Sequence, residues 1–172
     1  GFAGYVILRG FEPAVAMIAQ VPFSSINYYP ITTIPLFVFM GTILFSTEIG
    51  NDLYYAAYRW VGQFRGGLAM ATVLACALFG AITGIAIPAL ITMGKVAIPE
   101  MKKYGYEDSF ASGCVACAST LAVLIPPSIP MILYGVLTQN SIGLLFMAGL
   151  MPGVLLTVMF IITIIIQTRL NK

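Results

Sequence analysis

Charged residues divide this chain into long apolar stretches. No Asp, Glu, Lys or Arg occurs at positions 13–47, 66–94 or 109–168. A helix that crosses a bilayer needs about 20 mostly apolar residues, so these stretches hold several crossings. The pattern predicts an all-α, multi-pass membrane protein, a multi-span helical bundle with the lipid bilayer as its surroundings.

The first part of the chain, residues 1–65, is expected to form scaffold-like helices. Residues 1–8 resemble the end of a membrane helix. Residues 11–28 predict an interfacial helix interrupted by prolines, and residues 34–48 the next crossing, which Gly50 would end. Asn51 is a candidate N-cap for an amphipathic helix over 51–63. This helix lies either at the headgroup level or packed on the protein.

Residues 66–102 form two apolar limbs, at 68–82 and 88–101, around an apolar tip at 83–87. Each limb has about 15 residues and is about 22 Å long as a helix. The hydrocarbon core is about 30 Å thick, and an apolar tip is poorly placed in water. The pattern favours a re-entrant helical hairpin with its tip buried in protein, and the alternative is two tilted spans.

Residues 107–138 predict a discontinuous helix. Pro126, Pro127 and Pro130 lie within five positions, and each removes a backbone donor and clashes with the preceding turn. The helix must break there, leaving carbonyls near 122–124 without helical partners, and a second half-helix follows over 131–138. A final helix over 142–168 carries Gly149 and Gly153 as a close-contact face. Residues 66–172 thus form one predicted unit.

Composition excludes several functions. Hydrophobic residues make up 60% of the chain, charged residues 8%, and the mean hydropathy is +0.99. A net charge of +2 is too small for nucleic-acid binding, and the absence of His and of paired carboxylates in apolar runs argues against an intramembrane enzyme.

Cys114 and Cys117 have redox-motif spacing but are expected to be small buried side chains. Basic residues lie between or after the apolar runs, as expected of cytoplasmic ends: Arg59, Arg65, Lys102, Lys103, Arg169 and Lys172.

A hairpin beside a broken helix is a recurring device of secondary transporters. Carbonyls freed at the break can coordinate a cation, and the N-terminus of a half-helix favours an anion. No carboxylate is available, so a Na⁺ site of neutral oxygens is the natural hypothesis, with no cofactor. The candidate cation-binding residues are Thr83, Gly84, Leu124, Ile125 and Ser128. The candidate substrate-facing residues are Ser119, Thr120 and Pro127.

Several ordered motifs now carry a family resemblance. They are Ile34-Pro35-Leu36-Phe37-Val38-Phe39-Met40-Gly41, Gly66-Gly67-Leu68-Ala69-Met70-Ala71-Thr72, Ile98-Pro99-Glu100-Met101 with Tyr104-Gly105-Tyr106, Leu124-Ile125-Pro126-Pro127-Ser128-Ile129-Pro130, and Ser141-Ile142-Gly143 with Ala148-Gly149-Leu150-Met151-Pro152-Gly153. Over essentially the whole chain they resemble the large membrane subunit of TRAP (tripartite ATP-independent periplasmic) transporters, specifically its first inverted repeat.

The resemblance implies a Na⁺-driven elevator permease in the bacterial inner membrane. Its partners would be the second half of the large subunit, a small membrane subunit and a periplasmic binding protein that delivers organic acids such as dicarboxylates or sialic acid. The chain opens without Met and matches one repeat, so we expect an internal fragment or one half of a split protein. The tip, Thr83-Gly84-Ile85-Ala86, has fewer hydroxyls than is usual in the family. A truncated, non-transporting membrane remnant is the alternative.

Overall fold

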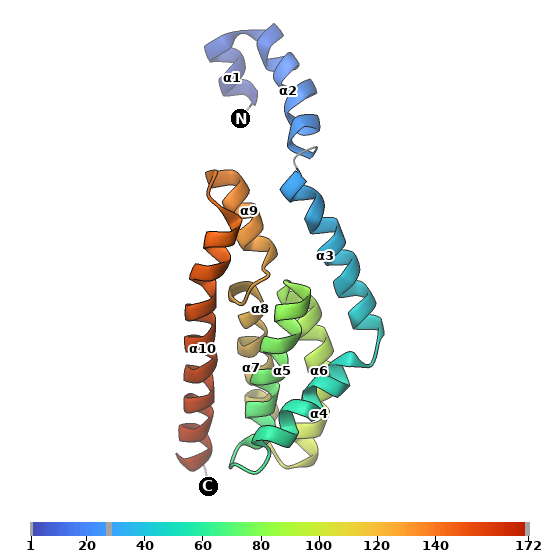
Figure 1. The fold of residues 1–172 in the computed structure, drawn as a ribbon, viewed down its shortest axis with the longest axis vertical. Helices are drawn as coiled ribbons and strands as arrows, with labels where there is room; N and C mark the ends of the chain where they lie inside the picture. Colours follow the sequence, from blue (N-terminus) through green and yellow to red (C-terminus); the bar gives the residue numbers. More distant parts are fainter. Residues whose placement is uncertain (1, 27–28, 171–172) are drawn as a thin grey trace.

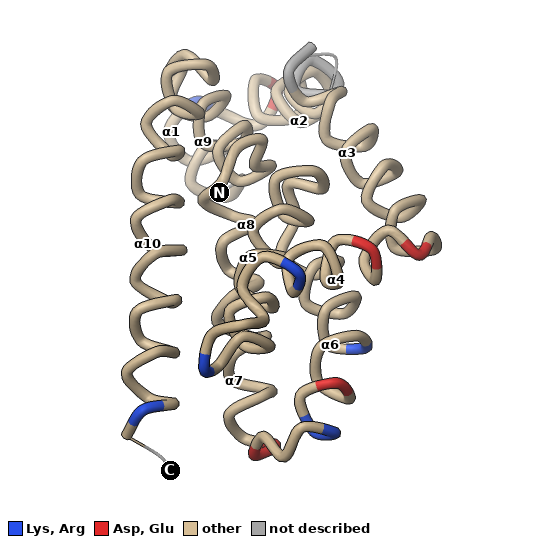
Figure 2. Tube along the Cα trace, turned by 60° about the horizontal axis from the view of Figure 1, so that its bottom comes forward, with Lys and Arg blue, Asp and Glu red and all other residues tan. Residues whose placement is uncertain are grey.

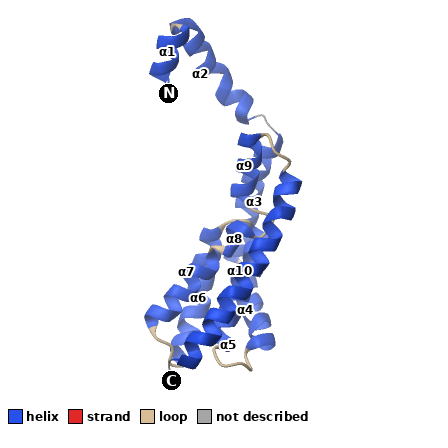
Figure 3. Cartoon of the chain, turned by 90° about the vertical axis from the view of Figure 1, so that its left-hand side faces the viewer, coloured by secondary structure: helices blue, strands red, loops and turns tan. Residues whose placement is uncertain are grey.

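The computed structural model describes residues 2–26 and 29–170, and within these ranges the chain is helical without any β-strand (Figure 3). The last two residues of the interfacial helix predicted over 11–28, and the basic residue Lys172, lie outside the described residues. The helices are α1 (Phe2–Arg9), α2 (Phe11–Ile26), α3 (Tyr29–Ser46), α4 (Ile49–Val61), α5 (Gly67–Thr83), α6 (Ala86–Lys103), α7 (Asp108–Ser119), α8 (Leu121–Leu124), α9 (Ile129–Thr138) and α10 (Ile142–Leu170).

The helices α1 and α2 extend beyond the rest of the bundle, at the end opposite the C-terminus (Figure 1). Proline does not interrupt α2 as we predicted. Pro13 falls in the first turn, where a missing N–H has no partner to lose, and the helix continues through Pro22. The predicted crossing at 34–48 is longer at its start, since α3 already begins at Tyr29.

The chain turns sharply between α3 and α4, whose axes differ by 74°. The predictions for this turn were wrong in detail. Helix α4 begins at Ile49, with Glu48 in the cap position and no side-chain cap bond, so Asn51 lies inside the helix. Gly50 also lies inside the helix. A glycine is needed there because the Thr92 side chain of α6 occupies the space that a Cβ would need.

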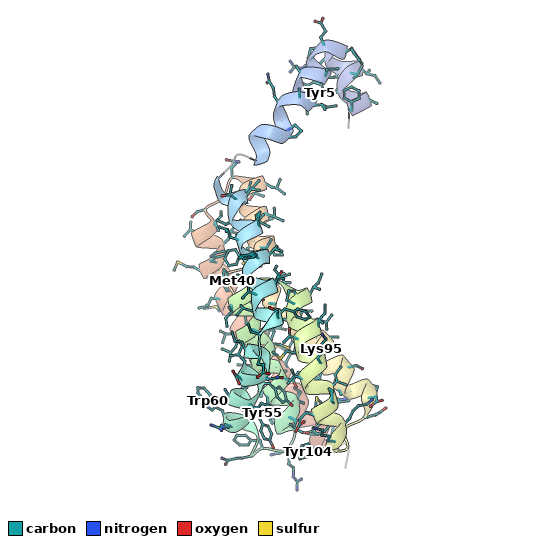
Figure 4. All side chains as sticks on the ribbon, turned by 90° about the vertical axis from the view of Figure 1, so that its right-hand side faces the viewer. Tyr5, Met40, Tyr55, Trp60, Lys95 and Tyr104 are labelled. Carbon is teal, nitrogen blue, oxygen red and sulfur yellow. The ribbon has the colours of Figure 1, made fainter. Side chains whose placement is uncertain are left out.

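One face of α4 packs on the protein. Tyr54 and Ala57 are buried in the same core as α5, while Trp60 is 83% exposed and Tyr55 51% exposed (Figure 4). Of the two alternatives for this helix, packing on the protein therefore describes its buried face. The exposed aromatic rings remain available for the membrane interface.

The helices α5 and α6 form the hairpin, joined only by Gly84 and Ile85. Both limbs are longer than predicted, because regular helix continues through Thr83 and resumes at Ala86. Of the 17 residues of α5, 13 are buried, and its many alanines allow the neighbouring helices to approach closely. This helix is the centre of the molecule, with α4, α6, α7 and α8 around it (Figure 1).

The predicted discontinuous helix is confirmed. It consists of α7, α8 and α9, and the segment 125–128 separates α8 from α9 with a bend of 40°. Among the described residues, α10 is long and apolar enough to cross a membrane by itself, and two bent pairs meet the same test if each is one span: 31–46 with 49–61, and 108–124 with 129–138.

Several charged residues lie toward the end of the bundle where α10 finishes (Figure 2). Salt bridges lie there: Lys102 Nζ is 2.8 Å from Asp108 Oδ2, and Lys103 Nζ is 3.0 Å from Glu100 Oε2. The bond to Glu100 raises the pKa of Lys103.

The expectation that both cysteines of the Cys-x-x-Cys segment are buried was wrong. Cys117 is exposed and Cys114 is partly buried. One side of α7 packs on the core and the other side faces outward, and the two cysteines lie at different positions around the helix. All three cysteines are free thiols in this structure.

Candidate functional site

The hairpin tip meets the break between α8 and α9 directly. The backbone N–H of Ile129 donates to the carbonyl of Gly84 at 3.2 Å. Gly84 has φ +67°, a left-handed conformation that costs other residues free energy. A Cβ at this position would lie 2.7 Å from the carbonyl oxygen of Pro127. Glycine is therefore required both by the turn and by the close approach of the two backbones.

Two buried hydroxyls flank this contact. The Thr83 side chain donates to the carbonyl of Phe79 at 3.0 Å, and Ser128 donates to the carbonyl of Val123 at 2.6 Å. Both residues have no exposed surface. Because each hydroxyl proton is used on a helix carbonyl, the oxygen lone pairs remain free to accept a hydrogen bond or to coordinate a cation.

Carbonyl oxygens without hydrogen bonds surround the break. In the described ranges, the carbonyls of Leu124, Ile125 and Pro127 accept no hydrogen bond. The prediction placed such carbonyls at 122–124, but Val123 is satisfied by the Ser128 hydroxyl. Unpaired backbone carbonyls are rare in buried positions, and they are the hard oxygen ligands that a small cation prefers.

The site lies part-way along the spanning helix. Gly149 and Gly153 of α10 are buried, and a Cβ on either would contact Leu124 or Ile125 of the break, confirming their predicted role as a close-contact face. Gly153 is about 17 Å from the start of α10 and about 26 Å from its end, at 1.5 Å per residue. The hairpin is thus re-entrant: its tip ends part-way along the span, where Thr83 and Gly84 are covered by protein, while Ile87 at the end of the tip is exposed.

The predicted substrate-facing residues are not all brought together. Pro127 contacts the tip through its carbonyl. Ser119 and Thr120 lie one short helix away, at the junction of α7 with α8, and their hydroxyls donate to the carbonyls of Ala116 and Cys117. Ser119 is buried and Thr120 is exposed. Of the candidate site residues, these two stand apart from the tip and the break.

Two glycine contacts that position the site were not predicted. A Cβ on Gly80 would lie 2.5 Å from the Cα of Ala122, so α5 and α8 touch backbone to backbone just before the tip. Gly41 of α3 faces the Thr83 and Pro88 side chains at 3.8–3.9 Å. The sequence signal for Gly80 is its place four residues before Gly84 in an alanine-rich helix, but nothing local shows which helix it meets.

No charged residue lies in the sequence that forms the site. The nearest charge on the hairpin limbs is Lys95 of α6, whose ammonium lies 4.8 Å from the centre of the Phe45 ring of α3. Figure 4 shows Lys95 on the side of the bundle, away from the tip. The electrostatics at the site therefore come from backbone dipoles, in particular the N-terminus of α9.

The comparison with known proteins decides the family. The family described as "Tripartite ATP-independent periplasmic transporter, DctM component" matches residues 2–172. This chain belongs to the DctM component family of TRAP transporters. The resemblance noted in the motifs is thereby confirmed, and the all-helical membrane fold agrees with it.

Several curated TRAP permeases are similar to this chain. The C4-dicarboxylate TRAP transporter large permease protein DctM of Pseudomonas aeruginosa is 38% identical over 100% of this chain and 40% of its own length. The ectoine/5-hydroxyectoine TRAP transporter large permease protein UehC of Ruegeria pomeroyi is 37% identical over 92% of this chain and 37% of its own. The sialic acid TRAP transporter large permease protein SiaM of Vibrio cholerae is 34% identical over 80% and 32%. The chain thus spans about two fifths of the length of these relatives.

Proposed function

We propose that this chain is the first inverted repeat of the large permease of a Na⁺-coupled TRAP importer for organic acids, in the bacterial inner membrane. The observation that carries the proposal is the contact between Gly84 and Ile129, inside the span and among neutral oxygen atoms. The relatives support organic acids as the substrate class, since the names of three specify the carboxylates C4-dicarboxylate, sialic acid and ectoine, and the name of another specifies isethionate, a sulfonate.

Na⁺ would bind where the tip meets the break. Its ligands would be the hydroxyl oxygens of Thr83 and Ser128 and the carbonyls of Gly84, Leu124 and Ile125, none of which has a formal charge. Because the tip has few hydroxyls, most of the ligands would be backbone carbonyls. Bound Na⁺ would hold the tip against the break, where a single backbone hydrogen bond joins them in this structure.

The substrate carboxylate would lie near the N-terminus of α9. The partial positive charge of a helix start stabilises an anion. Because the Ile129 N–H donates to Gly84 and Pro130 has no N–H, the N–H of Met131 would be the donor left for the carboxylate, beside Pro127. Residues 66–172 would then move as a unit past scaffold helices in residues 1–65. The partners would be the second half of the large subunit, the small membrane subunit and a periplasmic binding protein.

The test is uptake of a labelled dicarboxylate, and separately of sialic acid, into proteoliposomes that contain the complete permease with its small subunit and binding protein. We expect uptake to require an inward Na⁺ gradient and to stop when choline replaces Na⁺. The variant Ser128→Ala should raise the Na⁺ concentration for half-maximal uptake, and Ser141→Ala, outside the site, should not.

Two results would contradict the proposal in different ways. Equal uptake in choline would eliminate Na⁺ coupling but leave the permease function standing. Absence of uptake for every organic acid tested, carboxylates and isethionate alike, with all partners present and the protein folded, would favour the non-transporting remnant.

A further inference from the structure

A cavity of about 790 Å³ opens at the charged end of the bundle. It lies between the α4–α5 loop, the α6–α7 loop and the last turn of α10. Its walls combine opposite charges with aromatic rings. The residues that matter are Arg65, Tyr104, Tyr106, Glu107, Phe110 and Gln167.

A second, apolar groove of about 340 Å³ continues from this cavity between α7 and α10. The two share Ser109, Phe110 and Gln167 in their walls. From Gln167 to Phe160 along α10, the groove extends about 10 Å into the apolar span. A polar cavity at the membrane surface therefore connects to an apolar channel that points toward the bilayer centre.

The two charges in the cavity have no partner in the part of the chain that the structure describes. In the ranges 2–26 and 29–170, Arg65 and Glu107 form no ion pair, although Lys102 and Lys103 nearby are both paired. Arg65 and Glu107 are exposed and face a common space without reaching each other. A ligand that carries both a negative and a positive group matches this arrangement.

We propose that the cavity and groove bind a phospholipid with an ethanolamine headgroup. Arg65 would hold the phosphate, Glu107 the ammonium, and one acyl chain would lie in the groove beside Gly113 and Ile164. Tyr104 and Tyr106 lie at the level where aromatic side chains favour the membrane interface. The site does not depend on Na⁺ coupling, so its test stands apart from that of transport.

The charges select this headgroup over its relatives. An anionic glycerol headgroup offers a phosphate to Arg65 but no cation to Glu107, whose carboxylate would then lie unpaired beside it. A choline headgroup has a cation without N–H donors, so it can make no hydrogen bond to the carboxylate. Charge-assisted hydrogen bonds are the stronger kind, which ranks ethanolamine first.

The experiment is native mass spectrometry of the complete, delipidated permease titrated with phosphatidylethanolamine, phosphatidylglycerol and phosphatidylcholine of identical acyl chains. Arg65→Gln should weaken binding of all three by about tenfold, while Arg169→Gln, an exposed cation at the same end outside the cavity wall, should not. Glu107→Gln should abolish the preference for ethanolamine over glycerol. Circular dichroism of each variant verifies folding.

The groove has its own variant. A Cβ on Gly113 would meet nothing within 4 Å, so Gly113→Leu fills the groove without a backbone clash and should lower binding of all three lipids. Gly143→Leu, at the other end of α10, is the matched control. Soluble phosphoethanolamine, which lacks a tail, should fail to displace the lipid at equal concentration.

The proposal is overturned if Arg65→Gln binds as Arg169→Gln does, or if Gly113→Leu binds as Gly143→Leu does. It is also overturned if the ethanolamine preference survives in Glu107→Gln. Binding of no lipid by the wild-type permease would overturn it as well.

Discussion

Replacing Gly84 with alanine tests whether the tip and the break hold each other. The variant introduces a Cβ 2.7 Å from the carbonyl oxygen of Pro127, at a residue with φ +67°. It therefore adds backbone strain and steric conflict at one point. Gly105 is the matched control, because it has φ +80° but a Cβ there would meet nothing within 4 Å.

The two glycines separate the two contributions to the free energy of unfolding. An L-residue in the left-handed region costs about 1–2 kcal/mol, and the stiffer unfolded chain of an alanine variant returns about 0.4–1 kcal/mol. Gly105→Ala should therefore destabilise by about 1 kcal/mol. Gly84→Ala must also move the Pro127 backbone and weaken the 3.2 Å bond from Ile129, which adds about 1–3 kcal/mol.

The assay is equilibrium unfolding of the complete permease in mixed micelles, followed by circular dichroism, with and without Na⁺. We expect Gly84→Ala to lose about 2–4 kcal/mol and to lose most of any stabilisation by Na⁺, whereas Gly105→Ala keeps it. Equal losses in the two variants would show that only the glycine conformation matters, and the argued contact between tip and break would be refuted.

Three further predictions follow from single contacts. Ser128→Ala removes the 2.6 Å hydrogen bond of a fully buried residue and should lower the unfolding free energy by about 1–2 kcal/mol in the same assay, with Ser128→Thr as the conservative comparison. Gly80→Val should be more damaging than Gly80→Ala, because α5 touches the Ala122 backbone there, and loss of folded protein on gel filtration measures it. Lys95→Met should remove the cation–π contact with Phe45, with an effect of about 0.5–1 kcal/mol at this exposed site, whereas Lys95→Arg should retain it.

Features that depend on nearby residues were predictable from the sequence. The break between α8 and α9 follows from prolines at three of five positions, since each acts on its own turn of helix. The hairpin follows from two limbs joined by a short apolar segment, and the family follows from ordered motifs. The candidate residues Thr83, Gly84 and Ser128 do lie at one place in the structure.

Boundaries and exposure were less predictable. Gly50 and Asn51 resemble a helix stop and a new start, but both lie within α4. The glycine serves close packing against Thr92 instead of ending a helix. Cysteine is a residue type that is usually buried, yet Cys117 faces outward from α7. In a membrane helix, apolar residues occur on all sides, so polarity no longer identifies the buried face.

The sequence by itself determined that the chain is membrane-embedded, where its helices break, and which family it belongs to. These properties depend on the charge-free length of each stretch and on the local effects of proline and glycine. Only the tertiary structure decided that Gly84 meets Ile129, that Gly80 meets Ala122, and that Arg65 and Glu107 share one cavity. These partners are about 40 or more residues apart, and their contact depends on how whole helices pack, which no local pattern encodes.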